Sequence, residues 1–221
     1  MNIYISPHPD DAILSCGGRI IKESDKKQTV INVFTASYDG LTEWDRKCGL
    51  LAEPMKKRLK EDKQILSELG VKVINLDFHD AAVYSDLKGK KRSAERKMEI
   101  KDKLTDKLNV FPGNGKIFFP SGMGHVDHAL LRDVGTSLNR KNIIFYEDIP
   151  YSINQRRKNK ERYNLSREIL NRKIDLIMRY KTQLPGLLEL TNSETIKSFR
   201  EKLFNLHSEN GSFCERFTFE L

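Results

Sequence analysis

Two short polar segments carry the residue types that bind metals and move protons. They are residues 6–11, with the sequence SPHPDD, and residues 125–128, with the sequence HVDH. Each follows a short apolar run, at 2–5 and 116–119, where a strand would hand over to a helix. The carboxyl ends of parallel strands are where α/β sheets place their ligands. Together the segments bring three histidines and three aspartates, a donor set that favours a catalytic metal centre with zinc as first candidate.

Two adjacent carboxylates and a pair of glycines mark the first segment. Asp10 and Asp11 are neighbours in a turn that opens a helix, so their side chains point in different directions and one can bind a metal while the other stays free. Gly17 and Gly18 stand well inside the following helix, where each costs about 1 kcal/mol relative to alanine. We therefore expect another backbone or a ligand to come close to these glycines.

The second segment places two histidines three residues apart. If a helix begins there, His125 and His128 face one cavity, while Asp127 points elsewhere and is better placed to hold a histidine tautomer. Taken alone, the first segment also fits an ordinary helix start and the second a polar loop. Their joint occurrence at two strand ends favours a metal-dependent hydrolase.

Hydrophobic periodicity predicts an α/β protein. Apolar, β-branched runs alternate with helical patterns, which indicates a Rossmann-like open, mostly parallel sheet with helices on both faces. The predicted strands are 2–5, 29–35, 72–76, 116–119 and 142–146, and the predicted helices are 12–23, 55–69, 94–108 and 128–138.

The pattern changes after Pro150. Two amphipathic helices are predicted at 165–181 and 193–207, and the alternating run 213–219 fits an edge strand. With 221 residues, the chain fits a single domain over 1–221, made of a core at about 1–150 and a C-terminal helical extension at about 151–221.

Composition narrows the classes of protein. The three cysteines are widely spaced without a C-x-x-C pair, which favours a reducing cytoplasm over a disulfide framework. No signal peptide is visible, and no run approaches the roughly 20 apolar residues of a membrane span.

The net charge of +8 is concentrated at 88–107 and 156–173. These stretches fit solvated helix faces or loops; the alternative is a basic rim for an anionic substrate or an anionic membrane surface.

The two segments resemble the signature of the zinc-dependent N-deacetylases called the PIG-L or LmbE-like family. The resemblance rests on the segments themselves together with Leu14 and the Gly17-Gly18 pair, and it extends over about residues 1–185. One departure is Ala12, which stands where the family often has glutamate. Weaker agreement comes from Arg58-x-x-Glu61, Leu69-Gly70, Asp80, residues 146–151 and Tyr180-x-x-Gln183.

The resemblance implies a metal site with two histidines and one carboxylate. His8, Asp11 and His128 would bind one Zn²⁺ per chain, although another divalent ion could take its place. Positions would remain open for water and the substrate carbonyl.

It also implies roles for the other polar residues. Asp10 would be the general base, and His125, in its protonated form and oriented by Asp127, would stabilise the oxyanion. Arg58 and Asp80 would hold the sugar or its substituent. The resemblance leaves the roles of Glu147 and Asp148 open.

The resulting hypothesis is a cytoplasmic hydrolase that removes the acetyl group from an N-acetylated amino sugar, such as N-acetylglucosamine, or its conjugate. Its partner would be this small molecule, with no nucleic acid and no transmembrane segment, and a homo-oligomer is compatible with the sequence. One alternative is another metal-dependent amide or ester hydrolase at the same site. The other is a basic nucleic-acid-binding module, although the basic stretches lack interleaved aromatic residues. Loops at 38–53 and 83–92 would decide specificity.

Overall fold

The computed structural model describes residues 1–111, 114–138, 140–154, 161–209 and 211–218. A single sheet of eight strands forms its centre. The strands are β1 (Asn2–Ser6), β2 (Gln28–Asn32), β3 (Lys72–Asn75), β4 (Lys116–Pro120), β5 (Ile143–Tyr146), β6 (Glu161–Leu165), β7 (Ser208–Glu209) and β8 (Ser212–Thr218). Their order is β3-β2-β1-β4-β5-β8-β6, and β7 pairs with β8.

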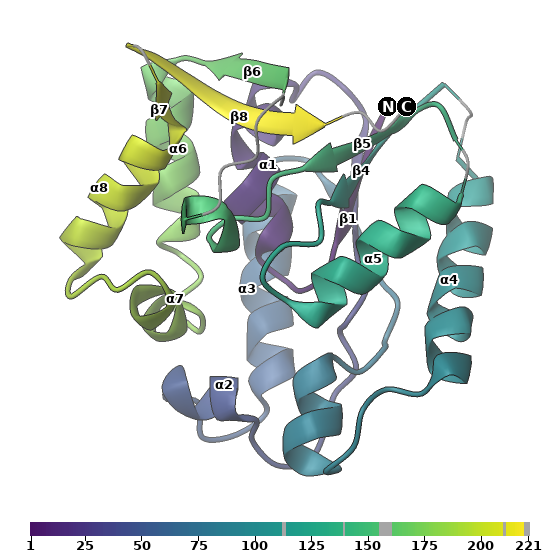
Figure 1. The fold of residues 1–221 in the computed structure, drawn as a ribbon. Coiled ribbons are helices and arrows are strands. Elements are labelled where there is room, and N and C mark those ends of the chain that lie inside the picture. Colours follow the sequence, from purple (N-terminus) through teal and green to yellow (C-terminus); the bar gives the residue numbers. More distant parts are fainter. Residues whose placement is uncertain (112–113, 139, 155–160, 210, 219–221) are drawn as a thin grey trace.

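Helices cover both faces of this sheet (Figure 1). α1, α3, α6 and α8 contribute to the core on one face, and α4 and α5 to the core on the other. The helices and short turns are α1 (Asp11–Lys22), α2 (Glu43–Lys47), α3 (Pro54–Glu68), η1 (Val83–Leu87), α4 (Ala94–Asn109), α5 (Val126–Ser137), η2 (Tyr151–Asn154), α6 (Arg167–Ile177), α7 (Leu184–Leu190) and α8 (Ile196–His207). The predicted α/β fold is confirmed.

The alternation of side chains along β1 shows why both faces need helices. Tyr4 belongs to the core beneath α1 and α6, whereas Ile3 and Ile5 belong to the core beneath α4 and α5. All three side chains are fully buried. A strand that is apolar on both faces is typical of a parallel sheet covered on both sides.

The order in which strands are added to the sheet reverses at β1. From β1 the sheet grows through β2 and β3 on one side, and through β4 and β5 on the other, with all these neighbours parallel. The connections that leave β1 and β4 therefore diverge to opposite faces and open a crevice between them. Such a switch point is the usual ligand site of open α/β sheets.

The last strand lies inside the sheet and not at its edge, which corrects the prediction for 213–219. β8 pairs antiparallel with both β5 and β6, so β6 is the edge strand. Alternating polarity predicts a strand but does not identify its neighbours, and residues 214–217 are buried. Position 219 lies outside the described residues.

The two basic stretches are not uniformly solvated. Residues 156–160 of the second stretch lie outside the described residues, but Lys173 is fully buried in α6. Its Nζ donates to Glu215 Oε1 at 2.7 Å and lies 3.0 Å from His207 Nε2. In the first stretch, Arg92 has a side chain that is only 5% exposed.

The same buried network explains the double glycine of α1. A Cβ on Gly17 would lie 3.1 Å from Lys173 Cγ, and one on Gly18 would lie 2.5 Å from Leu165 Cδ1. The backbone N–H of Gly18 also donates to Glu215 at 2.7 Å. Something does come close to the glycines, as expected, but it is a set of side chains, most of them from the C-terminal part, and not another backbone.

The described cysteines Cys16, Cys48 and Cys214 are buried and free. None of the helices in the described part of the chain combines the length and apolarity that a membrane span requires.

Candidate active site

The two polar segments meet at the crevice between β1 and β4. The first connects β1 to α1, and the second reaches the start of α5. Asp10, which caps α1, has φ 142°, a backbone conformation that costs a non-glycine residue on the order of 1–3 kcal/mol. Its carbonyl accepts from the N–H groups of Ile13 and Leu14, which hold this geometry in place. Backbone strain of this kind concentrates at functional sites.

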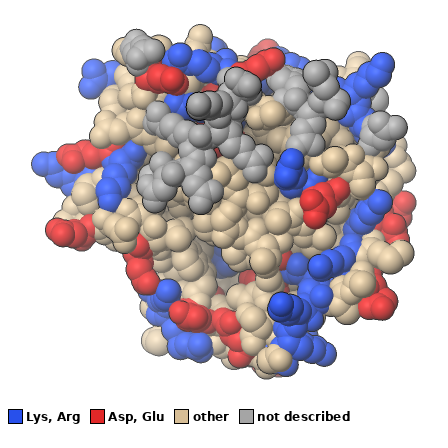
Figure 2. Space-filling model, viewed as in Figure 1, with Lys and Arg blue, Asp and Glu red and all other residues tan. Residues whose placement is uncertain are grey.

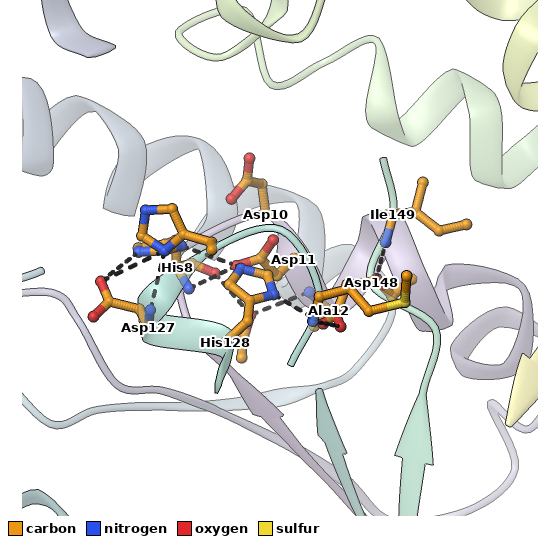
Figure 3. Close-up of polar contacts among 12 residues, drawn as sticks. His8, Asp10, Asp11, Ala12, Asp127, His128, Asp148 and Ile149 are labelled. Atoms are coloured by element: carbon orange, nitrogen blue, oxygen red, sulfur yellow. Dashed lines mark hydrogen bonds and ion pairs between the residues drawn. The ribbon is translucent and has the colours of Figure 1, made fainter. Parts of the chain in front are cut away.

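His128 lies between two carboxylates (Figure 3). Its Nδ1 is 2.8 Å from Asp148 Oδ1, and its Nε2 is 3.3 Å from Asp11 Oδ2. Asp148 is fixed in turn, because its Oδ2 accepts from the Ser121 hydroxyl at 2.7 Å and from the Met123 N–H at 2.8 Å. Burial lowers the pKa of His128, but Asp11 and Asp148 outweigh it and raise that pKa to about 10.

His8 makes a similar bridge between Asp11 and Asp127. Its Nδ1 lies 3.2 Å from Asp11 Oδ2 and its Nε2 lies 3.2 Å from Asp127 Oδ2. Burial again lowers the pKa, but the hydrogen bonds to the two carboxylates raise the pKa of His8 to about 9. For Asp11, burial acts upward and the two histidines outweigh it, so its pKa is lowered.

These donors fit a tetrahedral cation. Two ligand atoms bound to Zn²⁺ at about 2.0–2.1 Å with tetrahedral angles lie about 3.3 Å apart. Asp11 Oδ2 lies 3.2 Å from His8 Nδ1 and 3.3 Å from His128 Nε2. His128 Nε2 is also buried without a hydrogen bond of acceptable geometry among the described residues, so it can bind a cation once it has lost its proton. Ring nitrogens of His8, His125 and His128 all lie within 4.8 Å of one another.

Asp127 contacts His8 more closely than His125. Its Oδ2 is 3.9 Å from His125 Nδ1 but 3.2 Å from His8 Nε2. Its Oδ1 accepts from Arg92 Nη1 at 2.6 Å, and its Oδ2 also accepts from the Ala81 N–H at 2.9 Å. The link to His125 runs instead through the Asp127 backbone N–H, which donates to His125 Nδ1 at 3.2 Å.

The state of His125 differs from the protonated form that the sequence suggested. Burial and the neighbouring charge of His8 lower the pKa of His125 to about 4. Because Nδ1 accepts a hydrogen bond, the proton of the neutral ring resides on Nε2. His125 lines the pocket and has a side chain that is 29% exposed, so it meets a ligand as a neutral N–H donor.

Asp10 is the carboxylate that stays apart from the histidine cluster. Its Oδ1 lies 3.8 Å from Arg58 Nη2. Burial and the charge of Asp11 raise the pKa of Asp10 to about 8, although Arg58 opposes this rise. The two adjacent aspartates thus occupy different environments, with pKa values displaced in opposite directions, as expected for groups with different tasks.

A pocket of about 90 Å³ opens in front of these groups. Arg58 and Asp80, the predicted sugar-binding residues, both line it and are both buried. The loop 38–53 supplies one wall through Trp44, whose Nε1 donates to Gln183 Oε1 at 2.9 Å. α2 and α7 approach closely here, since a Cβ on Gly186 would lie 2.6 Å from Trp44. The pocket lining comprises His8, Asp10, Asp11, Leu14, Trp44, Arg58, Asp80, Ala82, His125, Pro150, Tyr151, Gln183, Leu187 and Leu190.

Two contributors could not be assigned from the sequence. Asp148 belongs to the site through His128, whereas its neighbour Glu147 lies 3.7 Å from Arg216 and outside it. The position of Asp148 after a predicted strand was the available signal. Arg92 carried no signal beyond its charge, and it was counted among the solvated basic residues.

Comparison with known proteins places the chain in a family of de-N-acetylases. Residues 3–139 match the family described as PIG-L, GlcNAc-PI de-N-acetylase, and the chain belongs to this family. The 2'-N-acetylparomamine deacetylase of Niallia circulans is 29% identical over 184 residues, a match that covers 67% of this chain and 66% of that protein. The protein of the same name from Streptomyces fradiae is 26% identical over 160 residues, covering 68% and 57%. The match thus spans less than two thirds of each relative's length.

The fold is also similar to a crystal structure described as the zinc inhibited form of teicoplanin deacetylase Orf2. The TM-score is 0.80 at 21% sequence identity, with 97% of this chain and 96% of that chain covered. The similarity therefore extends beyond residues 3–139 and includes the C-terminal helices and strands.

Proposed function

We propose that this protein is a zinc-dependent hydrolase that removes the acetyl group from an N-acetylated amino sugar or its conjugate. The observation that carries the proposal is the spacing of Asp11 Oδ2 from His8 Nδ1 and His128 Nε2, at 3.2 and 3.3 Å. These three atoms have the spacing of tetrahedral ligands, and they lie beside Asp10, whose backbone is strained, at the switch point of the sheet. The names of the two curated relatives support the same chemistry for this chain.

His8, Asp11 and His128 would hold one Zn²⁺. His125 is the other candidate ligand by proximity, but its Nδ1 already accepts from the Asp127 N–H and the rest of its ring lines the pocket. When bound, the ion supplies Lewis acidity that activates water and polarises the amide carbonyl. Asp148 and Asp127 accept from the outer nitrogens of His128 and His8 and so fix the ring orientations.

Asp10 would act as the general base. Its carboxylate takes a proton from the attacking water, whose oxygen adds to the acetyl carbon. As the C–N bond breaks, the same proton passes to the departing amine, so that acetate and the free amino sugar leave. Burial and Asp11 raise the pKa of Asp10 to about 8, and Arg58 opposes this rise and so favours the ionised form that this role requires.

His125 would stabilise the tetrahedral oxyanion. Its Nε2–H is a neutral donor on a ring that lines the pocket, and it needs no change of protonation to act between about pH 5 and 8, because burial and the charge of His8 lower the pKa of His125 to about 4. Arg58, Asp80 and Trp44 would contact the sugar, with the indole offering an apolar face and the two charged groups offering hydrogen bonds to hydroxyls.

The test is acetate release by the zinc-loaded protein from a panel of N-acetylated amino sugars and their glycosides. We expect release from at least one member, loss after chelation and recovery on adding zinc. Two histidine variants provide a matched comparison. His8→Ala should lose both zinc and turnover, whereas His79→Ala should keep both, since His79 does not line the pocket. Turnover that survives chelation would refute the proposal.

A further inference from the structure

A second hollow adjoins the candidate active site. Its volume is about 730 Å³, against about 90 Å³ for the first pocket, and the two share His125 and Ala82 in their walls. Small-molecule sites usually measure about 300–1,000 Å³. The first pocket alone is small for a sugar conjugate, so most of a larger substrate must extend beyond it, and the hollow on the other side of His125 is the adjoining space.

The floor of this hollow is apolar. It is formed by Ala81 and Ala82 before η1 and by one side of α5, where Val126 is 65% exposed. An exposed valine beside a catalytic histidine gains from contact with the carbon skeleton of a ligand. The full lining is Ala81, Ala82, Ser85, Lys90, Lys91, Arg92, Lys97, Gly124, His125, Val126, Ala129, Leu130 and Asp133.

The rim of the hollow is positively charged. Lys90, Lys91 and Lys97 line it and are solvent-exposed, and no ion pair engages their ammonium groups among the described residues. Arg92 is already committed to Asp127 and to the His79 carbonyl. Figure 2 shows Lys and Arg side chains gathered at the lower right of this face. They lie over the segment between η1, the short helix at the bottom of Figure 1, and α4. Asp133 is the one acid of the described lining.

We propose that this hollow, the lysine pocket (Lys90, Lys91 and Lys97 above Val126 and Leu130), binds a negatively charged group on the aglycone of the substrate. The inference rests on the proposed function, because it places the acetamido sugar at His125 and the remainder of the same molecule under the lysines. Three ammonium groups against one carboxylate select an anion, and the apolar floor accommodates a carbon linker between the sugar and the charge. An aglycone with protonated amines is disfavoured by the same charges.

The test uses three glycosides of N-acetylglucosamine that share a short alkyl aglycone and end in a carboxylate, a carboxamide or an ammonium group. With the zinc-loaded protein, kcat/KM should be highest for the carboxylate and lowest for the ammonium. Each solvent-exposed ion pair contributes about twofold, so three give a preference of about eightfold for the carboxylate over the carboxamide. The preference should shrink as ionic strength rises.

Two triple variants with equal changes of net charge locate the effect. Lys90→Gln, Lys91→Gln and Lys97→Gln together should bring the three values of kcat/KM to within about twofold of each other. The control replaces Lys56, Lys60 and Lys63 by glutamine; these lysines line a separate groove along α3 and β3, so the wild-type order should persist.

Each outcome decides the inference. The expected order in the wild type, lost only in the lysine-pocket variant, supports it. Equal rates on the three glycosides in the wild type, an order that survives in the lysine-pocket variant, or an order that is lost in both variants overturns it. Failure to release acetate from any of the three glycosides would also overturn the inference, because it places the acetamido sugar of such a glycoside at His125; the proposed function is tested separately by acetate release from the panel of N-acetylated amino sugars.

Discussion

Replacing Asp148 by asparagine should weaken zinc binding without removing a zinc ligand. Asp148 accepts three hydrogen bonds, from the Ser121 hydroxyl and the Met123 N–H on Oδ2 and from His128 Nδ1 on Oδ1. An asparagine has one oxygen and one NH₂ group, so it cannot accept on both sides. If its oxygen stays with Ser121 and Met123, its NH₂ group faces His128 Nδ1. The ring then carries its proton on Nε2, the atom that would bind the metal.

The expected loss is about 10- to 100-fold in zinc affinity, which is the usual effect of removing a partner of a ligating histidine. This corresponds to about 1.4–2.8 kcal/mol, since each tenfold change is worth about 1.4 kcal/mol. Competition with a chromophoric chelator at pH 7.5 measures the dissociation constant, and thermal unfolding of the metal-free variant checks that the fold is retained.

Glu147→Gln is the matched control. Glu147 precedes Asp148, is also buried, and lies 3.7 Å from Arg216. Its replacement should leave the zinc dissociation constant within about threefold of the wild type. An Asp148→Asn protein that binds zinc as tightly as the wild type would refute the tautomer argument, and so would an equal loss in the control.

Three further results are expected. Zinc affinity should rise with pH. Burial lowers the pKa of His8 and His128, but the neighbouring carboxylates outweigh it and raise the pKa of His8 to about 9 and that of His128 to about 10. Both histidine protons must therefore leave when the ion binds. Competition titrations at pH 6.5, 7.5 and 8.5 should show zinc binding that tightens by up to about 100-fold for each pH unit. A zinc affinity that does not change with pH would contradict the assignment of His8 and His128 as ligands. Lys173→Met should lower the free energy of unfolding, measured in urea, by about 3 kcal/mol, because it removes the ammonium partner of the buried Glu215 carboxylate. Replacement of the exposed Lys181 by methionine should change that free energy by less than about 0.5 kcal/mol. We also propose that residues 1–221 form one domain, so unfolding followed by circular dichroism and by Trp44 fluorescence should coincide, and two separate transitions would contradict this.

The parts of the fold that could be predicted are those set by local hydrophobic periodicity. The helix predicted at 94–108 forms as Ala94–Asn109, and the strand predicted at 72–76 forms as Lys72–Asn75. α2 was missed within 38–53 because it has five residues and is held by a Thr42–Asp45 capping box and by the distant Gln183. β6 was missed because its strand structure depends on pairing with β8, far along the chain.

The candidate site also contains residues that a local sequence pattern predicts and residues that only the tertiary structure brings in. Its histidines and aspartates in the two segments could be proposed from residue type and position after a strand, and the structure brings these segments together. Partners that depend on tertiary structure could not. Asp148 reaches His128 across 20 residues of sequence and Arg92 reaches Asp127 across 35, so neither pairing leaves a local pattern. The charge state of His125 depends on burial and on His8, which also requires the fold.

The most direct test of the proposed centre is to measure zinc content and acetate release together in Asp10→Asn and Asp11→Asn. The two changes are chemically identical and one residue apart, so each controls for the other. Asp10→Asn should keep about one zinc per chain and lose on the order of 10²- to 10⁴-fold in kcat, the usual contribution of a general base. Asp11→Asn should instead lose zinc, because it removes the oxygen that lies 3.2 and 3.3 Å from the two histidine nitrogens. Zinc lost from Asp10→Asn and kept in Asp11→Asn would reverse the two roles, and normal turnover in both would show that the catalytic centre lies elsewhere.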